Sequence, residues 1–215
     1  MYTDKEIANA LDLAVLRPTA RAEDVLVACK LVRENNICTI CVAPIYARLA
    51  VGEGVRVCAV VGFPHGNSTP AQKRDEAMAL IDAGVQELDV VINYGRLLDC
   101  DGGPVEQELT AIVDFAQLKG VIVKAILEAC YFTMPALKSA AIFCAQLGVD
   151  FVKTSSGYGL HGANPQNVAT LLQAVEPYRC EVKASGGITN YNDAAKFLDL
   201  GCTRLGASRF KELLP

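Results

Sequence analysis

Tryptophan is absent from this sequence, and only three methionines and two histidines occur among its 215 residues. No stretch reaches the roughly 18 uncharged apolar residues of a membrane-spanning helix, and residues 1–12 lack the apolar core of a secretory signal. The formal net charge of −4 disfavours general binding to nucleic acid or anionic membranes. We therefore expect a cytoplasmic protein whose partners are small molecules, with no nucleic-acid or membrane partner.

Cysteine is abundant by comparison, but its nine residues are an odd number scattered through apolar segments. Without a secretory signal, this pattern indicates reduced thiols packed as small apolar side chains. Cys38 and Cys41 have the CxxC spacing found in redox and zinc sites. Residues three apart on a strand face opposite sides, so these two thiols cannot bind one metal ion, and packing is the favoured interpretation.

The composition, 52% hydrophobic and 20% charged, suits one folded domain over residues 1–215. Within it, an amphipathic helix, a glycine, a short linker and an apolar strand recur in that order. Glycine readily adopts the left-handed conformation that follows a helix, which predicts helix ends near Gly84, Gly120, Gly148 and Gly201. Capping residues predict helix starts at Thr69, Thr133, Asn164 and Asn190.

The predicted strands are nearly continuous runs of valine, isoleucine and leucine, which is typical of parallel strands buried on both faces. Such strands alternate with helices either in a doubly wound sheet or in a closed barrel. Eight units favour a single (β/α)8 TIM barrel, an α/β fold, over the roughly five units of a flavodoxin-like sheet. The strands are predicted near residues 11–16, 37–43, 56–62, 87–92, 121–127, 151–154, 181–185 and 203–206.

Charged residues interrupt four successive strands: Asp89, Lys124, Lys153 and Lys183, at spacings of 35, 29 and 30 positions. A buried charge is costly unless it is paired or neutralised, so a structural ion pair is an alternative for any one of them. Three lysines around one aspartate are instead typical of a site that makes a lysine less basic. Such a lysine is a neutral nucleophile, which predicts Schiff-base chemistry on a carbonyl substrate.

The loops after the last two predicted strands contain Gly186-Gly187 and Gly206-Ala207-Ser208. Glycine-rich loops at these positions of a β/α barrel commonly bind phosphate, because their backbone N–H groups can approach the anion closely. A pair of glycines alone is equally compatible with an ordinary turn. The position beside the lysines favours the phosphate interpretation.

Eight segments also resemble, in order, the deoxyribose-phosphate aldolase family: LDLAVLRPTA, ICTICVAPIYARLA, VVGFPHGNSTPAQKRDEA, ELDVVINYGRL, VKAILEAC, DFVKTSSGYGLHGA, VKASGGIT and RLGAS. The resemblance extends from Leu11 to Ser208. It implies that Lys153 forms the imine, that Lys183 keeps this amine uncharged, and that Asp89 is the general acid–base, acting with an ordered water.

The resemblance further implies reversible cleavage of 2-deoxy-D-ribose 5-phosphate to D-glyceraldehyde 3-phosphate and acetaldehyde, in deoxyribonucleoside breakdown. No metal or organic cofactor is expected, and a homodimer is expected by analogy with other barrel enzymes. Asp12 and Lys124 would support the catalytic lysines, and Cys41 would line the pocket. The remaining substrate-binding residues implied are Ser156, Gly157, Gly186, Gly187, Gly206, Ser208 and Arg209.

The sequence departs from the family pattern at Ser156, where threonine is usual, at Thr189, where many members have arginine, and at Arg209, where a small residue is commoner. We hypothesise that Arg209 partly compensates for the arginine missing at position 189. These departures concern the preference for a phosphorylated substrate and leave the imine chemistry unaffected.

Residues 157–162 match the GxGxxG pattern of dinucleotide sites, but no acidic residue ends the next predicted strand, so a loop over the phosphate is favoured. His65 and His161 lie 96 positions apart, which disfavours a metal-dependent aldolase. Two rival functions stay open. One is a lysine-imine aldolase with a different donor, and the second is a barrel that binds a sugar phosphate without catalysis.

Overall fold

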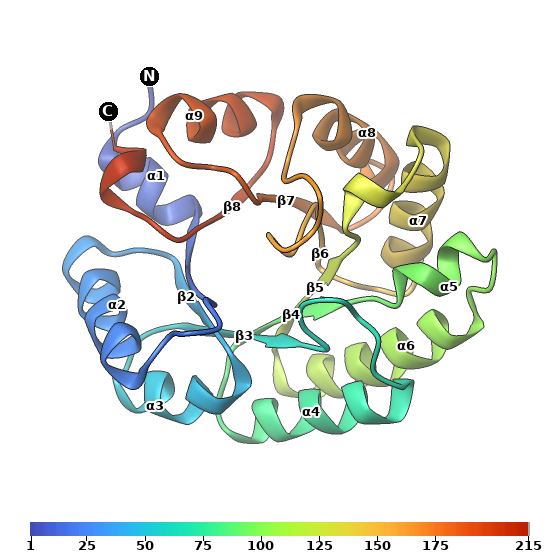
Figure 1. Ribbon diagram of the computed structural model, residues 1–215, viewed down its shortest axis with the longest axis horizontal. Helices are drawn as coiled ribbons and strands as arrows, with labels where there is room; N and C mark the ends of the chain where they lie inside the picture. Colours follow the sequence, from blue (N-terminus) through green and yellow to red (C-terminus); the bar gives the residue numbers. More distant parts are fainter. Residues whose placement is uncertain (215) are drawn as a thin grey trace.

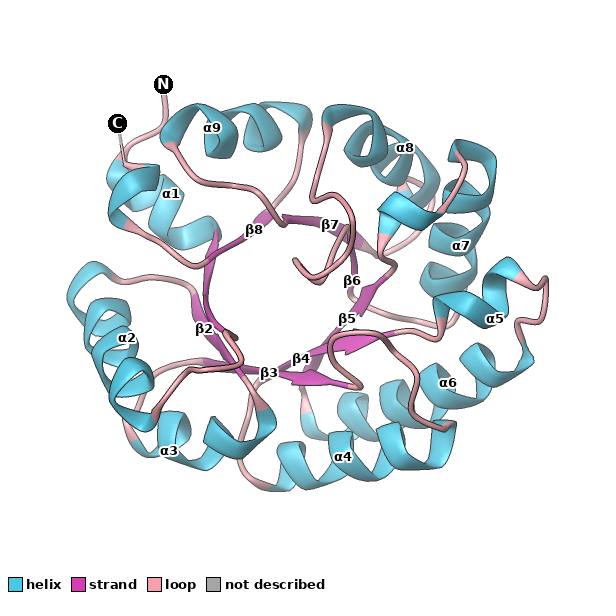
Figure 2. Cartoon of the chain, viewed as in Figure 1, coloured by secondary structure: helices cyan, strands magenta, loops and turns pink. Residues whose placement is uncertain are grey.

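A closed barrel of eight parallel strands forms the centre of the computed structural model, which describes residues 1–214 (Figures 1 and 2). The strands follow one another in chain order, and the last pairs with the first. The predicted barrel is therefore confirmed, and the doubly wound sheet is excluded. The strands are β1 (Leu11–Val15), β2 (Thr39–Val42), β3 (Val57–Val61), β4 (Glu87–Val91), β5 (Ile122–Ile126), β6 (Phe151–Lys153), β7 (Glu181–Ser185) and β8 (Arg204–Ala207).

Helices surround the barrel as an outer ring (Figure 1). They are α1 (Asp4–Ala10), α2 (Ala22–Asn35), α3 (Ala47–Gly52), α4 (Pro70–Asp82), α5 (Tyr94–Leu98), α6 (Gly103–Lys119), α7 (Met134–Gln146), α8 (Pro165–Val175) and α9 (Tyr191–Leu200). Three short 3-10 turns complete the described chain: η1 (Pro44–Tyr46), η2 (Ala129–Tyr131) and η3 (Lys211–Leu213). Over residues 1–214, none of the helices combines the length and the apolar character needed to cross a bilayer.

The predicted helix ends are confirmed at both termini. The side chains of Thr69, Thr133, Asn164 and Asn190 each accept a hydrogen bond from a backbone N–H in the first turn of α4, α7, α8 and α9. At the opposite end, Gly120 and Gly201 cap α6 and α9 in the left-handed conformation. Local sequence signals therefore set the lengths of these helices, and the helix lengths fix how far apart successive strands begin.

Alternation along each strand separates two cores of different chemistry. In β4, Leu88 and Val90 belong to the apolar core between the sheet and the helices. Glu87 and Asp89 point the opposite way, into the barrel, where they form ion pairs. Because side chains on a strand alternate with a period of two, the apolar outer core stabilises the fold while the barrel interior is free to hold charge.

Gly66 provides a test of how tightly the loop after β3 packs on β4. A Cβ at Gly66, which has a φ of +68°, would lie 2.1 Å from the backbone oxygen of Ile92. Gly54 has a similar φ of +71°, but a Cβ there would meet no atom within 4 Å. Gly54→Ala should therefore cost about 1 kcal/mol of unfolding free energy, from backbone strain alone. Gly66→Ala should cost about 3 kcal/mol or more, because a clash is added to the strain.

Urea unfolding of both variants, followed by circular dichroism, measures this difference. Equal losses of stability in the two variants would show that the contact between Gly66 and the end of β4 is loose.

Candidate active site

Three tiers of four inward side chains fill the barrel below its mouth, each tier drawn from alternate strands, as is usual in β/α barrels. The strand register and the side-chain contacts define the tiers. The lower tier consists of the first residues of the even strands: Thr39, Glu87, Phe151 and Arg204. The middle tier comes from the odd strands: Asp12, Cys58, Lys124 and Lys183. The upper tier returns to the even strands: Cys41, Asp89, Lys153 and Gly206.

Asp89 is the centre of this arrangement and is fully buried. Its Oδ2 accepts hydrogen bonds from Lys153 Nζ at 2.6 Å and from Lys183 Nζ at 2.8 Å. Its Oδ1 accepts from Lys124 Nζ at 2.9 Å. The four charges that were expected to converge therefore do so on a single carboxylate. Three ammonium groups share it, and two of them share one oxygen.

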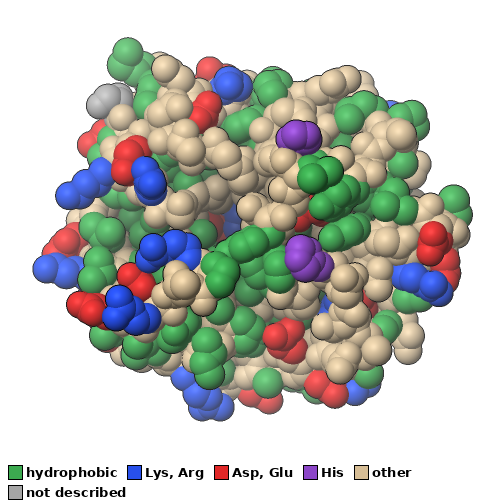
Figure 3. All heavy atoms as spheres, in the orientation of Figure 1, with side chains coloured by type: hydrophobic (Ala, Val, Ile, Leu, Met, Phe, Trp, Pro, Cys, Tyr) green, Lys and Arg blue, Asp and Glu red, His purple; other side chains and the backbone are tan. Residues whose placement is uncertain are grey.

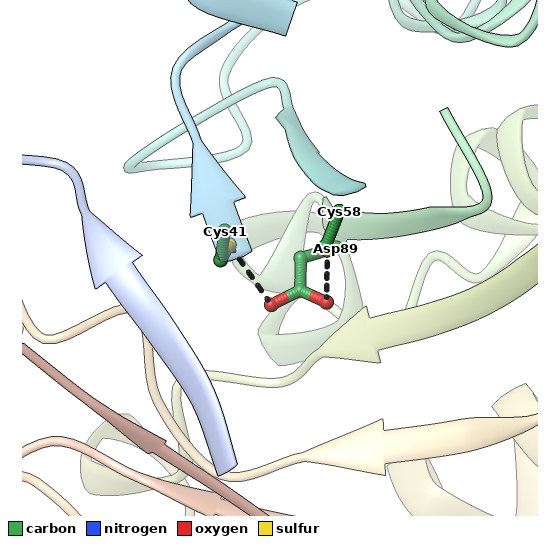
Figure 4. Close-up of side chains that lie close together, drawn as sticks. All are labelled: Cys41, Cys58 and Asp89. Atoms are coloured by element: carbon green, nitrogen blue, oxygen red, sulfur yellow. Dashed lines mark hydrogen bonds between the residues drawn. The ribbon is translucent and has the colours of Figure 1, made fainter. Parts of the chain in front are cut away.

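Two thiols approach the same carboxylate from β2 and β3 (Figure 4). Cys58 Sγ lies 3.2 Å from Asp89 Oδ1, and Cys41 Sγ lies 3.9 Å from Asp89 Oδ2. These three ligand-type atoms lie within 4.8 Å of one another, as do those of Asp12, Cys58 and Glu87. Lysine ammonium groups already contact the carboxylates in both sets, so neither set favours a metal cation on electrostatic grounds. Burial and Asp89 together raise the pKa of Cys58, which keeps it a thiol.

The lower tier adds charged residues that the sequence analysis missed. Glu87 Oε2 lies 2.5 Å from Lys124 Nζ and 3.0 Å from Arg204 NH1. Arg204 NH1 also lies 2.6 Å from Asp12 Oδ1. The expected set of three lysines around one aspartate is thus incomplete, because three carboxylates face four basic groups among the described interior residues. The available signal was spacing: Glu87 stands two positions before Asp89 and shares its face.

Mutual pairing holds these groups in their charged forms. Burial alone would raise the pKa of Asp12, but the cations of Lys183, Lys124 and Arg204 lower it to about 2. The pKa of Asp89 is likewise held well below its usual range, because the three lysines outweigh its burial. Burial alone would lower the pKa values of Lys124 and Lys183, but the surrounding carboxylates raise both.

A pocket of about 800 Å³ opens above the upper tier, on the side where the strands end. Gly206 lines it, and a Cβ at that position would lie only 2.8 Å from Ser185 Cβ and 3.3 Å from Lys183 Cε, so the glycine allows these two side chains to pack there. Lys124, expected among the substrate-binding residues, does not line this pocket and lies fully buried beneath Asp89. Asp89, expected as the general acid–base, does not line the pocket either, but it contacts Lys153 and Lys183, which do. The other expected residues do line it: Asp12, Cys41, Lys153, Ser156, Gly157, Lys183, Gly186, Gly187, Gly206, Ser208 and Arg209.

The loop between β6 and α8 crosses the barrel mouth (Figure 1). Glu128, at the end of β5, is buried and accepts a hydrogen bond from the backbone N–H of Ser156 at 3.2 Å. Tyr158 OH donates to the carbonyl of Leu16 at 2.8 Å, which ties the loop to the end of β1. The GxGxxG segment therefore belongs to a loop that follows Lys153 and covers the pocket side of the barrel (Figure 1). Glu128 has no sequence signature, because its role depends on a contact 28 positions away.

Charged and polar side chains at the rim complete the pocket. Arg209 lines the pocket and is exposed, with NH1 3.9 Å from Glu212 Oε1. Thr189 also lines the pocket, and its backbone N–H donates to Asp193 at 3.2 Å. His65 and His161 are both exposed. Figure 3 shows histidine side chains on the face over the barrel mouth, which is hollowed near its centre.

Known proteins are similar to this sequence over almost its whole length. A family model described as DeoC/LacD family aldolase matches residues 2–207. The chain belongs to the DeoC/LacD family of aldolases. This aldolase is 35% identical over 207 residues to the deoxyribose-phosphate aldolase of Treponema denticola, covering 94% of this chain and 95% of the relative. It is 39% identical over 212 residues to deoxyribose-phosphate aldolase 1 of Cutibacterium acnes, covering 97% and 96%.

Solved structures of other aldolases also have a fold similar to that of this chain. A deoxyribose phosphate aldolase from Aeropyrum pernix, described as a unique tetramer, superposes with a TM-score of 0.91 at 32% identity. That match covers 98% of this chain and 90% of the Aeropyrum pernix chain. An aldolase designated QR15 superposes with a TM-score of 0.90 at 30% identity, covering 96% and 93% of the two chains.

The low pKa values of Asp12 and Asp89 predict that the aldolase loses stability in acid. Each carboxyl has a lower pKa in the folded chain than the value of about 3.9 expected when unfolded. Protons therefore bind more tightly to the unfolded chain, so the ion-pair contribution is complete above about pH 5 and is lost as the pH falls toward 2.

Urea unfolding midpoints should therefore be clearly lower at pH 3 than at pH 6. Asp12→Asn should flatten this dependence, whereas Asp114→Asn, at an exposed position of α6, should leave it unchanged. Identical midpoints at the two pH values in the unmodified chain would contradict the assignment.

Proposed function

We propose that this aldolase reversibly cleaves 2-deoxy-D-ribose 5-phosphate to D-glyceraldehyde 3-phosphate and acetaldehyde through an imine on Lys153. The observation that carries the proposal is the position of Lys153 Nζ at the pocket base, 2.6 Å from Asp89 Oδ2. Lys183 Nζ contacts the same carboxylate oxygen. The substrate is inferred from the names of relatives that match nearly the full chain.

The proposed chemistry uses the lysine as an electron sink. Lys153 Nζ attacks the C1 aldehyde of the open-chain sugar, and loss of water gives a protonated imine. As a base removes the proton of the C3 hydroxyl, the C2–C3 bond breaks and C3 becomes the aldehyde carbon of glyceraldehyde 3-phosphate. The electrons of the broken bond form an enamine at C2. Protonation of C2 and hydrolysis of the resulting imine release acetaldehyde and regenerate the lysine.

Asp89 is proposed to carry the protons of these steps, with an ordered water as relay. Its Oδ2 lies within hydrogen-bond distance of both Lys153 and Lys183, so it is placed to receive a proton from one amine while the second stays charged. Lys183 is itself held by Asp12. A cationic Lys183 beside the reacting nitrogen favours the uncharged amine that the first step requires. This scheme needs no metal ion or organic cofactor.

We further propose that the phosphate binds above β7 and β8, where Gly186, Gly187, Ser208 and Arg209 line the pocket. The backbone at Gly186 and Gly187 has φ values of +85° and +77°, a conformation that orients successive N–H groups for an anion. Assembly as a homo-oligomer in the cytoplasm is inferred by analogy, because the Aeropyrum pernix relative is described as tetrameric.

Borohydride trapping tests the imine directly. With acetaldehyde and borohydride present, one two-carbon adduct should form on Lys153, detected by peptide mass mapping and insensitive to EDTA. Dihydroxyacetone phosphate should give no adduct, which separates this function from a lysine aldolase with another donor. An adduct confined to a different lysine, or none at all, would overturn the proposal.

Lys183→Leu should slow the trapping about 100-fold or more at neutral pH, because the neighbouring cation is lost. Lys119→Leu, at the exposed end of α6, is the matched control and should trap at the original rate. An unaltered rate in Lys183→Leu would refute the role assigned to this lysine.

Arg209→Ala should raise KM for the phosphorylated sugar about tenfold with little change in kcat, because one charged contact to the phosphate is lost. Unphosphorylated 2-deoxyribose serves as the matched substrate, and its kcat/KM should not change. If KM for the phosphorylated sugar stays the same, Arg209 does not compensate for Thr189.

A further inference from the structure

Within the three tiers of the described barrel interior, the basic groups outnumber the carboxylates by one; Glu128, at the barrel mouth, is buried but lies outside these tiers. The carboxylates of the tiers are Asp12, Glu87 and Asp89, and the basic groups are Lys124, Lys153, Lys183 and Arg204. All are buried, and the Arg204 side chain is the most exposed, at 10%. A surplus charge in a dry interior is unfavourable, and release of one proton relieves it. Arginine does not release protons at accessible pH, and burial raises the pKa of the Cys58 thiol, so the lysines are the basic groups that can release it.

The three lysines differ in the number of carboxylates that contact their ammonium nitrogen. Lys124 lies within 4.0 Å of three carboxylates: Asp12 at 3.5 Å, Glu87 at 2.5 Å and Asp89 at 2.9 Å. Lys183 contacts both Asp12 and Asp89. Lys153 contacts Asp89 alone among the described residues, and it shares that oxygen with Lys183. The surplus is therefore least stabilised at the amine that faces the pocket.

Arg204 and Glu87 control the size of this surplus from the lower tier. Arg204 supplies the fourth positive charge, yet it lies at the opposite end of the barrel from the pocket and does not line it. Glu87 supplies the third negative charge and reaches the upper tier only through Lys124, which contacts both Glu87 and Asp89. Neither residue is placed to touch a substrate.

We infer that Arg204 and Glu87 are positioning residues that set the pH at which the lysine network gives up the proton needed for imine formation. The inference rests on the proposed function. On this inference, the total charge of the barrel interior sets how readily Lys153 becomes an uncharged amine. The neighbouring Lys183 contributes only part of that effect. Because the groups are coupled, the pH midpoint belongs to the network as a whole.

Other ionisable groups also surround Lys153. Glu128, which follows β5, is a buried carboxylate that accepts a hydrogen bond from the backbone N–H of Ser156 at 3.2 Å and contacts none of the described lysines of the network. Glu128 is unchanged in every variant tested below, so it does not alter the direction of the shifts.

Strands β1 to β5 and β7 each contribute one ionisable group in the middle or upper tier. Strand β8 has Gly206 in the upper tier, and its only ionisable group in the tiers is Arg204, in the lower tier. Arg56 pairs with Glu87 at 2.6 Å from outside the barrel, but its side chain is 46% exposed and hence screened by solvent. The groups contributed by the strands are Asp12, Cys41, Cys58, Asp89, Lys124 and Lys183.

At the rim, exposed charges lie above the upper tier and pair with one another. Arg17 contacts Asp24 at 3.3 Å, and Arg209 contacts Glu212 at 3.9 Å. Glu23 also lines the pocket and is exposed. Solvent screens all of these groups, so they contribute less to the charge sum than the buried tiers do.

The test measures the pH midpoint of borohydride trapping with acetaldehyde, defined as the pH at which the trapping rate is half its plateau. Arg204→Met removes a positive charge and should move the midpoint up. Glu87→Gln removes a negative charge and should move it down. At an effective dielectric constant near 20, the loss of one buried charge from the network should shift the midpoint by roughly one pH unit in either direction.

Two further variants separate charge from packing. The double variant Arg204→Met/Glu87→Gln restores the original charge sum and should return the midpoint to within a few tenths of a unit of the unmodified chain. Arg204→Lys keeps the charge and should also keep the midpoint. Arg56→Met, which removes the half-exposed partner of Glu87, should shift the midpoint by much less than Arg204→Met.

Circular dichroism checks that each variant is folded, and Arg204→Gln replaces Arg204→Met if the latter is unfolded. Opposite shifts of the two single variants support the inference; equal or same-direction shifts overturn it, even if Lys153 is still trapped. Absence of any adduct on Lys153 in the unmodified chain overturns the proposed function as well, so the two failures are distinguishable.

Discussion

The shared carboxylate of Asp89 is the constraint on which the rest of the site depends. Three ammonium groups from successive strands converge on it, and without it they would repel one another in a dry interior. Bringing them together requires a closed barrel, because only closure turns neighbouring strands inward toward a common axis. The fold and the chemistry are therefore linked through one buried anion.

This interior could not stabilise the protein by itself, since burying ion pairs costs desolvation that their attraction only partly offsets. The stabilising burial lies on the outer face of the barrel, between the strands and the helices, where the packed residues include Leu88, Val90, Leu109 and Ile112. Separation of the two cores follows from strand alternation. It allows the inner face to hold charge at a cost that the outer face offsets.

The three tiers of the barrel interior also differ in what they contact. The upper tier faces the pocket, and at its fourth position Gly206 has no side chain, which allows Ser185 and Lys183 to pack against it. The middle tier fixes the partners of Asp89, and the lower tier closes the network with Arg204 and Glu87. Residues two tiers below the pocket thus belong to the same electrostatic unit as Lys153. Long-range Coulomb interactions persist there because little solvent is present to screen them.

Local signals in the sequence were sufficient for the helix caps, the strand positions and the order of Asp89, Lys124, Lys153 and Lys183, because each depends on neighbouring residues or on simple periodicity. The eight repeated units then favoured the barrel. Only the tertiary structure assigned Glu87, Arg204 and Glu128, and it moved Lys124 from the pocket to the layer beneath. Glu87 and Arg204 are the first residues of their strands, where a charged residue in a sequence is usually interpreted as part of an exposed loop. Whether they face water or the barrel axis is decided by the register of strands far apart in the chain.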